Sequence, residues 1–183
     1  MTTKTLTIEQ VLALLAEAPT RISVLSTNLS PAQLHTPPSP AEWSVNDVLA
    51  HLRSCSDMWG GSIARILAED KPTFKAVNPR TWIKQTDYLV LEFHASLQAY
   101  AAQRADLLST LEPLSHEVWS REATVLGAGK PLTRTVFTYA ESLVVHERPH
   151  LKQITRLCRK KLHGWIESKV RLKNNQGQDG RDY

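Results

Sequence analysis

The clearest helix start in the sequence is the stretch Glu42-Trp43-Ser44-Val45-Asn46-Asp47-Val48-Leu49-Ala50-His51-Leu52. The Ser44 side chain can accept a hydrogen bond from the backbone N–H of Asp47, whose carboxylate then lies at the positive end of the helix dipole. A helix is therefore predicted over residues 45–68. The polar, proline-containing stretch 69–72 is expected to end it.

Three further stretches carry apolar residues at helical spacing, and no strong alternating strand pattern is present. They cover residues 7–29, residues 87–111, and a segment that starts at Leu132 or Thr135 and ends near Leu162. Pro19 interrupts the first stretch, so a break or a kink is expected there. Gly164 is the expected terminator of the last helix, and residues 115–131 are predicted to form a long loop.

Four amphipathic helices in one domain bury their apolar faces most simply as a four-helix bundle, so the predicted fold class is all-α. The connections after the second and third helices are long, about fifteen residues or more. Connections of this length permit a crossover as well as simple up-and-down neighbours.

Length and composition indicate one domain in a reducing compartment. A chain of 183 residues can bury a core without disulfides. No apolar run approaches the roughly 20 residues of a membrane helix, and the first residues lack the apolar core of a secretory signal. Only Cys55 and Cys158 are present, which argues against a disulfide framework. We therefore expect a cytoplasmic protein with no membrane partner.

The net charge of +4 is unevenly distributed along the chain. Residues 156–183 hold 8 basic and 3 acidic side chains, so the remainder of the chain is close to neutral. We predict a bundle domain over residues 1–163 and a basic, polar, disordered tail over residues 164–183. A nucleic-acid binder would carry its positive charge on the folded surface, so nucleic acid is not an expected partner.

The sequence His146-Glu147-Arg148-Pro149-His150 places two imidazoles at i and i+4, close enough on one helix face to bind one ion. The string also matches the H-E-x-x-H signature of zinc peptidases. Pro149 argues against that interpretation because it removes a backbone hydrogen bond in the ligand-bearing turn, and no further downstream ligand follows in a recognisable pattern. His51 lies on the flank of the apolar stripe of its own helix. The residues alone thus leave two alternatives, a three-histidine metal site or ordinary histidines of the core and surface.

Helical spacing also suggests residues for proton transfer. Tyr139, His146 and His150 fall within a strip about 40° wide on one helix. Glu147 points to the centre of the apolar stripe, where a carboxylate must be paired, protonated or placed at a kink. Tyr139 and Glu147 are therefore the candidate catalytic residues.

The remaining candidates are ranked lower. Cys55, one turn after His51, is expected to be a small buried residue, and His94 to be a core histidine that can line the same cavity. The other histidines lie in loop or terminal contexts and are expected to be solvated; they are His35, His116 and His163. Glu147-x-x-His150 matches half of a di-iron pattern, but the second copy and the two extra glutamates are missing, which argues against such a site.

Residues 42–52 and His146-Glu147-Arg148-Pro149-His150-Leu151-Lys152-Gln153-Ile154 resemble the second-helix and fourth-helix signatures of the DinB-like (YfiT-like) metalloenzyme superfamily. The resemblance spans about residues 7–162. It implies a four-helix bundle of up-down-down-up topology. It also implies a divalent metal ion, zinc or nickel, held by His51, His146 and His150.

The function that this resemblance implies is a metal-dependent transferase or hydrolase acting on a small molecule. Characterised relatives include thiol-dependent transferases and an isomerase that use low-molecular-weight thiols, and members often form homodimers. Three imidazoles leave open coordination positions for water or a substrate thiolate. The first alternative is a non-catalytic metal-binding protein or dimer scaffold of the same fold, and the second is a regulatory module whose basic tail binds nucleic acid.

Overall fold

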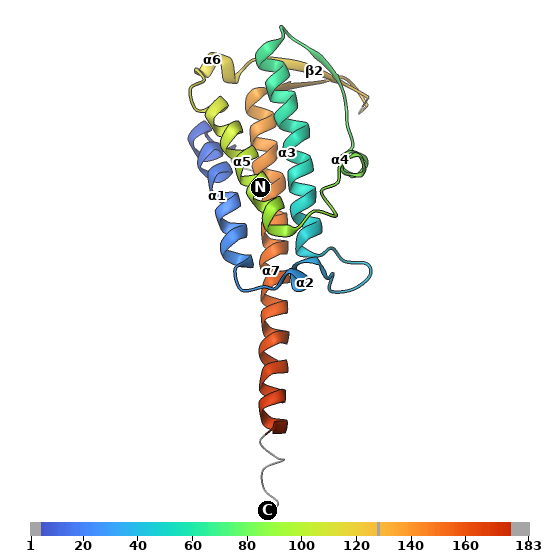
Figure 1. The fold of residues 1–183 in the computed structure, drawn as a ribbon. Helices are drawn as coiled ribbons and strands as arrows, with labels where there is room; N and C mark the ends of the chain where they lie inside the picture. Colours follow the sequence, from blue (N-terminus) through green and yellow to red (C-terminus); the bar gives the residue numbers. More distant parts are fainter. Residues whose placement is uncertain (1–4, 128, 177–183) are drawn as a thin grey trace, which may run out of the picture.

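The computed structural model describes residues 5–127 and 129–176, with side chains up to residue 162. Four long helices form the body of the molecule (Figure 1). They are α1 (Ile8–Ser26), α3 (Val45–Ala68), α5 (Phe93–Leu111) and α7 (Val136–Gln176). α1 and α7 run in one direction and α3 and α5 in the other, so the predicted all-α, up-down-down-up bundle is confirmed. α1 and α3 each pack against both α5 and α7.

Short elements complete the connections between these helices. They are α2 (Pro31–His35), β1 (Thr73–Lys75), α4 (Pro79–Trp82), the 3-10 helix η1 (Ile83–Gln85), α6 (His116–Trp119), β2 (Glu122–Leu126) and β3 (Leu132–Thr135). The segment from β1 to η1 returns the chain along the outside of the bundle, from the end of α3 to the start of α5 (Figure 1). No helix in the described part of the chain is long and apolar enough to cross a membrane.

Both predicted ends of α3 are confirmed. The Asp47 N–H donates to Ser44 Oγ over 3.0 Å, and the Ser44 N–H donates to Asp47 Oδ2 over 2.9 Å. These two bonds satisfy backbone donors that the first turn of a helix leaves free. α7 begins in the same way, because the Thr138 N–H donates to Thr135 Oγ1 over 3.1 Å and the Thr135 N–H to Thr138 Oγ1 over 2.7 Å.

The predicted start of α5 is wrong, and the break expected as one alternative at Pro19 is absent. α1 runs without a break through Pro19, because the apolar face on both sides of the proline is held in the core, with Leu15 and Ile22 fully buried. α5 begins at Phe93 and not near residue 87, since the Glu92 side chain accepts from the N–H of Ala95 and caps the helix there. The residues before Glu92 form turns on the surface.

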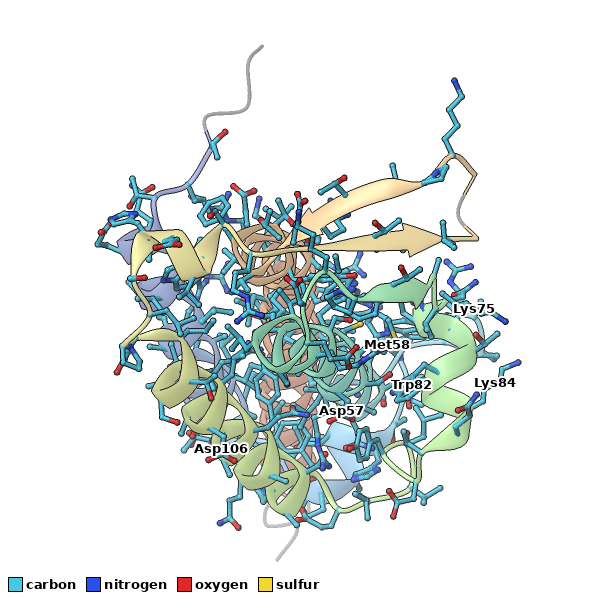
Figure 2. The ribbon with its side chains drawn as sticks, turned by 90° about the horizontal axis from the view of Figure 1, so that it is seen from above. Asp57, Met58, Lys75, Trp82, Lys84 and Asp106 are labelled. Atoms are coloured by element: carbon cyan, nitrogen blue, oxygen red, sulfur yellow. The ribbon has the colours of Figure 1, made fainter. Side chains whose placement is uncertain are left out.

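The predicted loop over residues 115–131 is also wrong, because it contains α6 and a strand of a three-stranded sheet. The strand order is β1-β2-β3, with β1 parallel and β3 antiparallel to β2. In β2 only Ala123 and Val125 point into the core, so the alternation is too short to predict a strand. The sheet lies across the end of the bundle where α3 ends and α7 begins (Figures 1 and 2).

α7 is longer than predicted. It continues past Gly164 to Gln176 and extends beyond the other helices (Figure 1), so the predicted end at Gly164 is wrong. One glycine costs a helix only about 1 kcal/mol relative to alanine, which is not enough to end it. The predicted disorder over residues 164–183 does not hold for the helical part, and residues 177–183 lie outside the described residues.

The buried apolar residues form two clusters along the bundle axis. The first includes Leu49 and Phe93 and gathers the start of α3, the start of α5 and residues 151–158 of α7. The second includes Ile63 and Leu111 and gathers the other ends of the helices together with the sheet. Between the two clusters, buried polar side chains occupy α3, α5 and α7; they are Ser54, Ser56, Arg104 and Glu147.

Candidate metal centre

Three histidines from two antiparallel helices meet beside this polar layer. His51 lies in the second turn of α3, and His146 and His150 lie one turn apart on α7. Their ring centroids are 5.0 Å (His51–His146), 4.9 Å (His51–His150) and 4.7 Å (His146–His150) apart. The Nε2 atoms of His51 and His146 are separated by 3.2 Å. The structure therefore brings together the three histidines that the sequence singled out.

The spacing of these rings suits a metal ion. An ion bound to imidazole nitrogens at about 2.0–2.1 Å in tetrahedral geometry holds those nitrogens about 3.3 Å apart. The His51 and His146 nitrogens, at 3.2 Å, are close to that separation. Of the side-chain nitrogens in the described residues, His146 Nδ1 is one of those that are buried without a hydrogen-bond partner.

Pro149 does not disturb this arrangement. It lies inside α7 on the exposed side of the helix. The carbonyl that loses its hydrogen bond belongs to Val145, whose residue is 52% exposed, so water can take the place of the missing N–H. His146 and His150 thus keep their i,i+4 relation across the proline.

Burial keeps the histidine rings neutral. It lowers the pKa of His51 and of His146 to about 4, and the neighbouring His150 ring adds to the effect. Burial also lowers the pKa of His150, although its hydrogen bond to Gln153 acts in the opposite direction. Neutral imidazole is the form that binds metal, so the lone pairs remain available near neutral pH.

Gln153 orients one of the three rings. Its side-chain oxygen Oε1 lies 3.2 Å from Nδ1 of His150. When His150 Nδ1 donates to this oxygen, Nε2 carries the lone pair, as in metal sites whose ligands are held by a second hydrogen bond. The sequence analysis did not single out Gln153, although its position three residues after His150 on one helix is a signal of contact.

Two tryptophans enclose the histidines. The Trp43 ring stacks on His150 at 6.1 Å with an interplanar angle of 12°, and it also contacts His51 at 5.1 Å. Trp59, two turns after His51 on α3, meets the His146 ring edge-on at 5.1 Å. These contacts fix the ring planes and replace water on the sides that they cover.

A cleft of about 560 Å³ adjoins the cluster through Trp59, which contributes to its wall. It lies between α3, the sheet and the α4 segment, and Figure 2 shows Met58 of α3 and Trp82 of α4 on its two sides. Tyr139, a predicted catalytic residue, also lines the cleft, and burial raises the pKa of its hydroxyl. Three cationic side chains are part of the wall; they are Arg65, Lys75 and Arg134.

Comparison with known families agrees with this architecture. A family model described as the DinB superfamily matches residues 14–154. The chain belongs to the DinB superfamily. The match contains α3, α5 and the part of α7 that carries His146 and His150, so the candidate metal centre lies inside the family domain.

Two proteins from Geobacillus are similar to this chain. A protein named "Putative metal-dependent hydrolase" from Geobacillus thermodenitrificans (strain NG80-2) is 26% identical over 164 residues, which covers 86% of each chain. A protein of the same description from Geobacillus kaustophilus (strain HTA426) is 25% identical over the same share. Among solved structures, YfiT from Bacillus subtilis, "a probable metal-dependent hydrolase with an unusual four-helix bundle topology", matches with a TM-score of 0.68 and 21% identity. That match covers 87% of this chain and 92% of YfiT.

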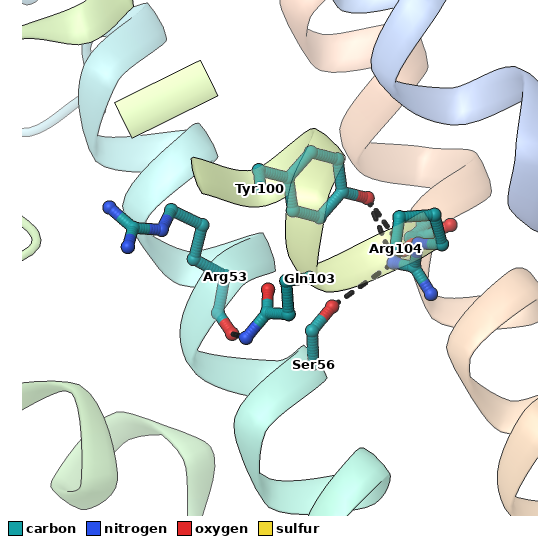
Figure 3. Close-up of polar contacts among 6 residues, drawn as sticks. Arg53, Ser56, Tyr100, Gln103 and Arg104 are labelled. Carbon is teal, nitrogen blue, oxygen red and sulfur yellow. Dashed lines mark hydrogen bonds and ion pairs between the residues drawn. The ribbon is translucent and has the colours of Figure 1, made fainter. Parts of the chain in front are cut away.

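Glu147, the other predicted catalytic residue, lies in a buried ion pair. Its carboxylate accepts from the Tyr100 hydroxyl over 2.7 Å and pairs with the Arg104 guanidinium, both from α5. Arg104 also donates to Ser56 Oγ and to the Tyr100 hydroxyl, each over 3.0 Å (Figure 3). Burial raises the pKa of Glu147, and Arg104 and Tyr100 oppose that shift. The carboxylate at the centre of the apolar stripe is therefore paired, which is one of the three alternatives that the sequence left open.

The three remaining histidines whose side chains the structure describes do not join the centre. His94 is exposed on α5, so its prediction as a core histidine is wrong, and His35 and His116 are exposed as predicted. The side chain of His163 lies outside the described residues. Cys55 and Cys158 are both buried, and burial raises the pKa of their thiols to about 12 and about 11.

Proposed function

We propose that this chain is a metal-dependent hydrolase of a small molecule, with a divalent ion bound by His51, His146 and His150. The observation that carries the proposal is the meeting of these three buried or half-buried rings, with two Nε2 atoms 3.2 Å apart. Three neutral imidazoles are one of the donor sets that catalytic zinc sites use. The names of the Geobacillus relatives agree with this reaction class.

A bound divalent ion would lower the pKa of a coordinated water towards neutrality and so supply a nucleophile. The protein's own residues provide what this chemistry requires of the site. Burial keeps the imidazoles unprotonated, Gln153 orients His150, and Trp43 and Trp59 cover the rings. The cleft beside Trp59 offers space for the substrate, and Tyr139 places a hydroxyl on its wall as a candidate proton donor.

Zinc or nickel is the proposed ion, because an imidazole donor set suits both. Hard ions such as Mg²⁺ prefer oxygen ligands and bind such a site poorly. The family resemblance also supports thiol transfer as a second reaction, in which a low-molecular-weight thiol takes the place of water at the same open position. A non-catalytic metal-binding or scaffold role is the remaining alternative. The homodimer and the cytoplasmic location stay predictions.

Elemental analysis of protein purified without an affinity tag tests the metal site. We expect one divalent ion per chain in the wild type and none in the triple variant His51→Ala, His146→Ala, His150→Ala. The matched control is His35→Ala, His94→Ala, His116→Ala, which removes three exposed histidines and should keep the ion. Equal metal content in both variants would contradict the site.

A substrate panel tests the reaction. Metal-loaded protein is incubated with small esters, amides and activated electrophiles, with and without a thiol, and product formation is followed. Turnover without thiol supports hydrolysis, and turnover that requires thiol supports transfer. Metal binding without turnover of any member favours the non-catalytic alternative.

A further inference from the structure

The two cysteines of the chain are equally buried but lie in different surroundings. Cys55 on α3 and Cys158 on α7 are each 1% exposed. Cys158 packs inside the first apolar cluster, with Ile154 and Leu157 as members of the same cluster. Cys55 belongs to neither of the two apolar clusters that the described residues form. Apolar burial therefore accounts for Cys158 but not for Cys55.

The surroundings of Cys55 are metal-binding side chains. It follows His51 by one turn on α3, and its Sγ lies 3.7 Å from Nε2 and 4.0 Å from Nδ1 of His51. Donor atoms of His51, Cys55 and His146 all lie within 4.8 Å of one another. In a tetrahedral site with a metal–sulfur bond of about 2.3 Å and a metal–nitrogen bond of about 2.05 Å, sulfur and nitrogen are about 3.6 Å apart. The Sγ–Nε2 distance is close to that value.

We infer that Cys55 supplies a thiolate ligand to the ion in this centre, beside the Nε2 atoms of His51 and His146. The inference rests on the proposed metal site and adds a sulfur donor to its histidines. When the bond between sulfur and metal forms, the S–H bond breaks and the proton passes to solvent, so metal uptake releases a proton from Cys55.

A thiolate changes which ions the centre prefers. Soft sulfur favours zinc and other thiophilic ions over ions that prefer oxygen ligands. With Cys55, His51 and His146 as ligands, the ion resembles catalytic zinc sites that combine cysteine with histidine and keep one position open. His150, held by Gln153, is then the ligand at the fourth position, and a substrate enters by displacing it from the ion. The substrate would bind at that position.

Cobalt spectroscopy on the full chain tests the inference. The tag-free protein is stripped of metal with a chelator and loaded with Co²⁺. Bound Co²⁺ gives d–d bands in the visible, and a cobalt–thiolate bond adds a charge-transfer band in the near ultraviolet. We expect both in the wild type and both in Cys158→Ser. Because the chain has only two cysteines, a charge-transfer band that survives Cys158→Ser comes from Cys55. The assignment therefore does not depend on the folding of a Cys55 variant.

The outcomes separate this inference from the proposed function. Visible bands without the charge-transfer band in the wild type would overturn the Cys55 ligand and leave the histidine site standing. A charge-transfer band lost in Cys158→Ser would also overturn it. Absence of any cobalt or zinc binding would overturn both. As a second measurement, Cys55→Ser should weaken zinc affinity by about tenfold or more, whereas Cys158→Ser should leave it unchanged.

Discussion

Replacing Arg104 with methionine isolates the buried ion pair between α5 and α7. The guanidinium and the Glu147 carboxylate are only 2% and 4% exposed, so little solvent is available to either charge. The methionine side chain has a volume similar to that of arginine. The Arg104→Met variant leaves the Glu147 carboxylate with the Tyr100 hydroxyl as its remaining partner. Removing one partner of a buried pair costs about 3–5 kcal/mol, a large part of a typical domain stability of about 5–15 kcal/mol.

Replacing the whole polar group should recover most of that loss. In the triple variant Arg104→Met, Tyr100→Phe, Glu147→Leu, no charge and no hydroxyl of the group remains buried without a partner. The Ser56 hydroxyl can turn to a carbonyl of its own helix. Apolar side chains of similar volume often match or exceed the stability of a buried pair. We expect the free energy of unfolding of the triple variant to be about 2 kcal/mol or more above that of Arg104→Met.

Urea unfolding of the metal-free protein, followed by tryptophan fluorescence, measures both values, with a chelator present so that ion binding does not add stability. Arg21→Met is the matched control. It breaks the exposed pair of Arg21 with Glu17 on α1, whose side chains are 46% and 53% exposed, and should cost about 0.5 kcal/mol or less. If Arg104→Met cost no more than this control, or if the triple variant were the least stable, the account of the polar layer would be refuted.

Three further perturbations test the site and the sheet. In the folded protein the pKa of His51 and of His146 is about 4, whereas the ordinary value, which applies to the unfolded chain, is 6.5. Between pH 4 and pH 6.5 the unfolded chain therefore binds more protons than the folded one. Metal-free protein should therefore lose stability as pH falls from about 6.5 towards 4, and a urea midpoint that rises over that range would contradict the assignment. Gln153→Ala should weaken zinc affinity by about 10–100-fold in a chelator competition, while unchanged affinity would show that the Gln153–His150 contact is dispensable. Gly127→Ala should cost about 1–2 kcal/mol in urea unfolding, because φ is +88° and the nearest atom to an added Cβ is 4.0 Å away, so only backbone strain opposes it; no change would exclude that strain.

Helices with local start and stop signals were predictable from the sequence. α3 was predicted at both ends because the Ser44 cap and the stretch after Ala68 act within a few residues. Pro19 and Gly164 were misleading for the opposite reason. Each carries a local penalty of a few kcal/mol or less, and packing of α1 and continuation of α7 outweigh it.

The sheet depends on contacts that no local pattern contains. β1 precedes α5 in the chain and β2 follows it, yet the two strands pair, with Phe74 opposite Val125. Each strand has three to five residues, and a pattern of that length does not separate a strand from a loop. This pairing depends on the bundle, which places the end of α3 beside the start of α7.

The candidate centre was predictable in part. The spacing of His146 and His150 and the family resemblance predicted the three histidines, and the apolar stripe predicted that Glu147 is paired, protonated or placed at a kink. Arg104 as that partner was not predictable, because a charged residue in the middle of a helix usually faces solvent. Cys55 was interpreted as a small buried residue, since spacing places it one turn from His51 but does not show that His146 of another helix lies beside both.

The topology explains why the histidines and the ion pair lie at one level. α3 and α7 are adjacent and antiparallel, so the second turn of α3 faces the middle of α7. Successive residues on α7 are rotated by about 100°, which turns His146 towards α3 and Glu147 towards α5. The ion pair between Glu147 and Arg104 thereby attaches α7 to α5. Glu147 lies between the two α7 histidines in the sequence. A change at Glu147 should consequently lower both stability and metal affinity, whereas a purely catalytic Glu147 would lower activity alone.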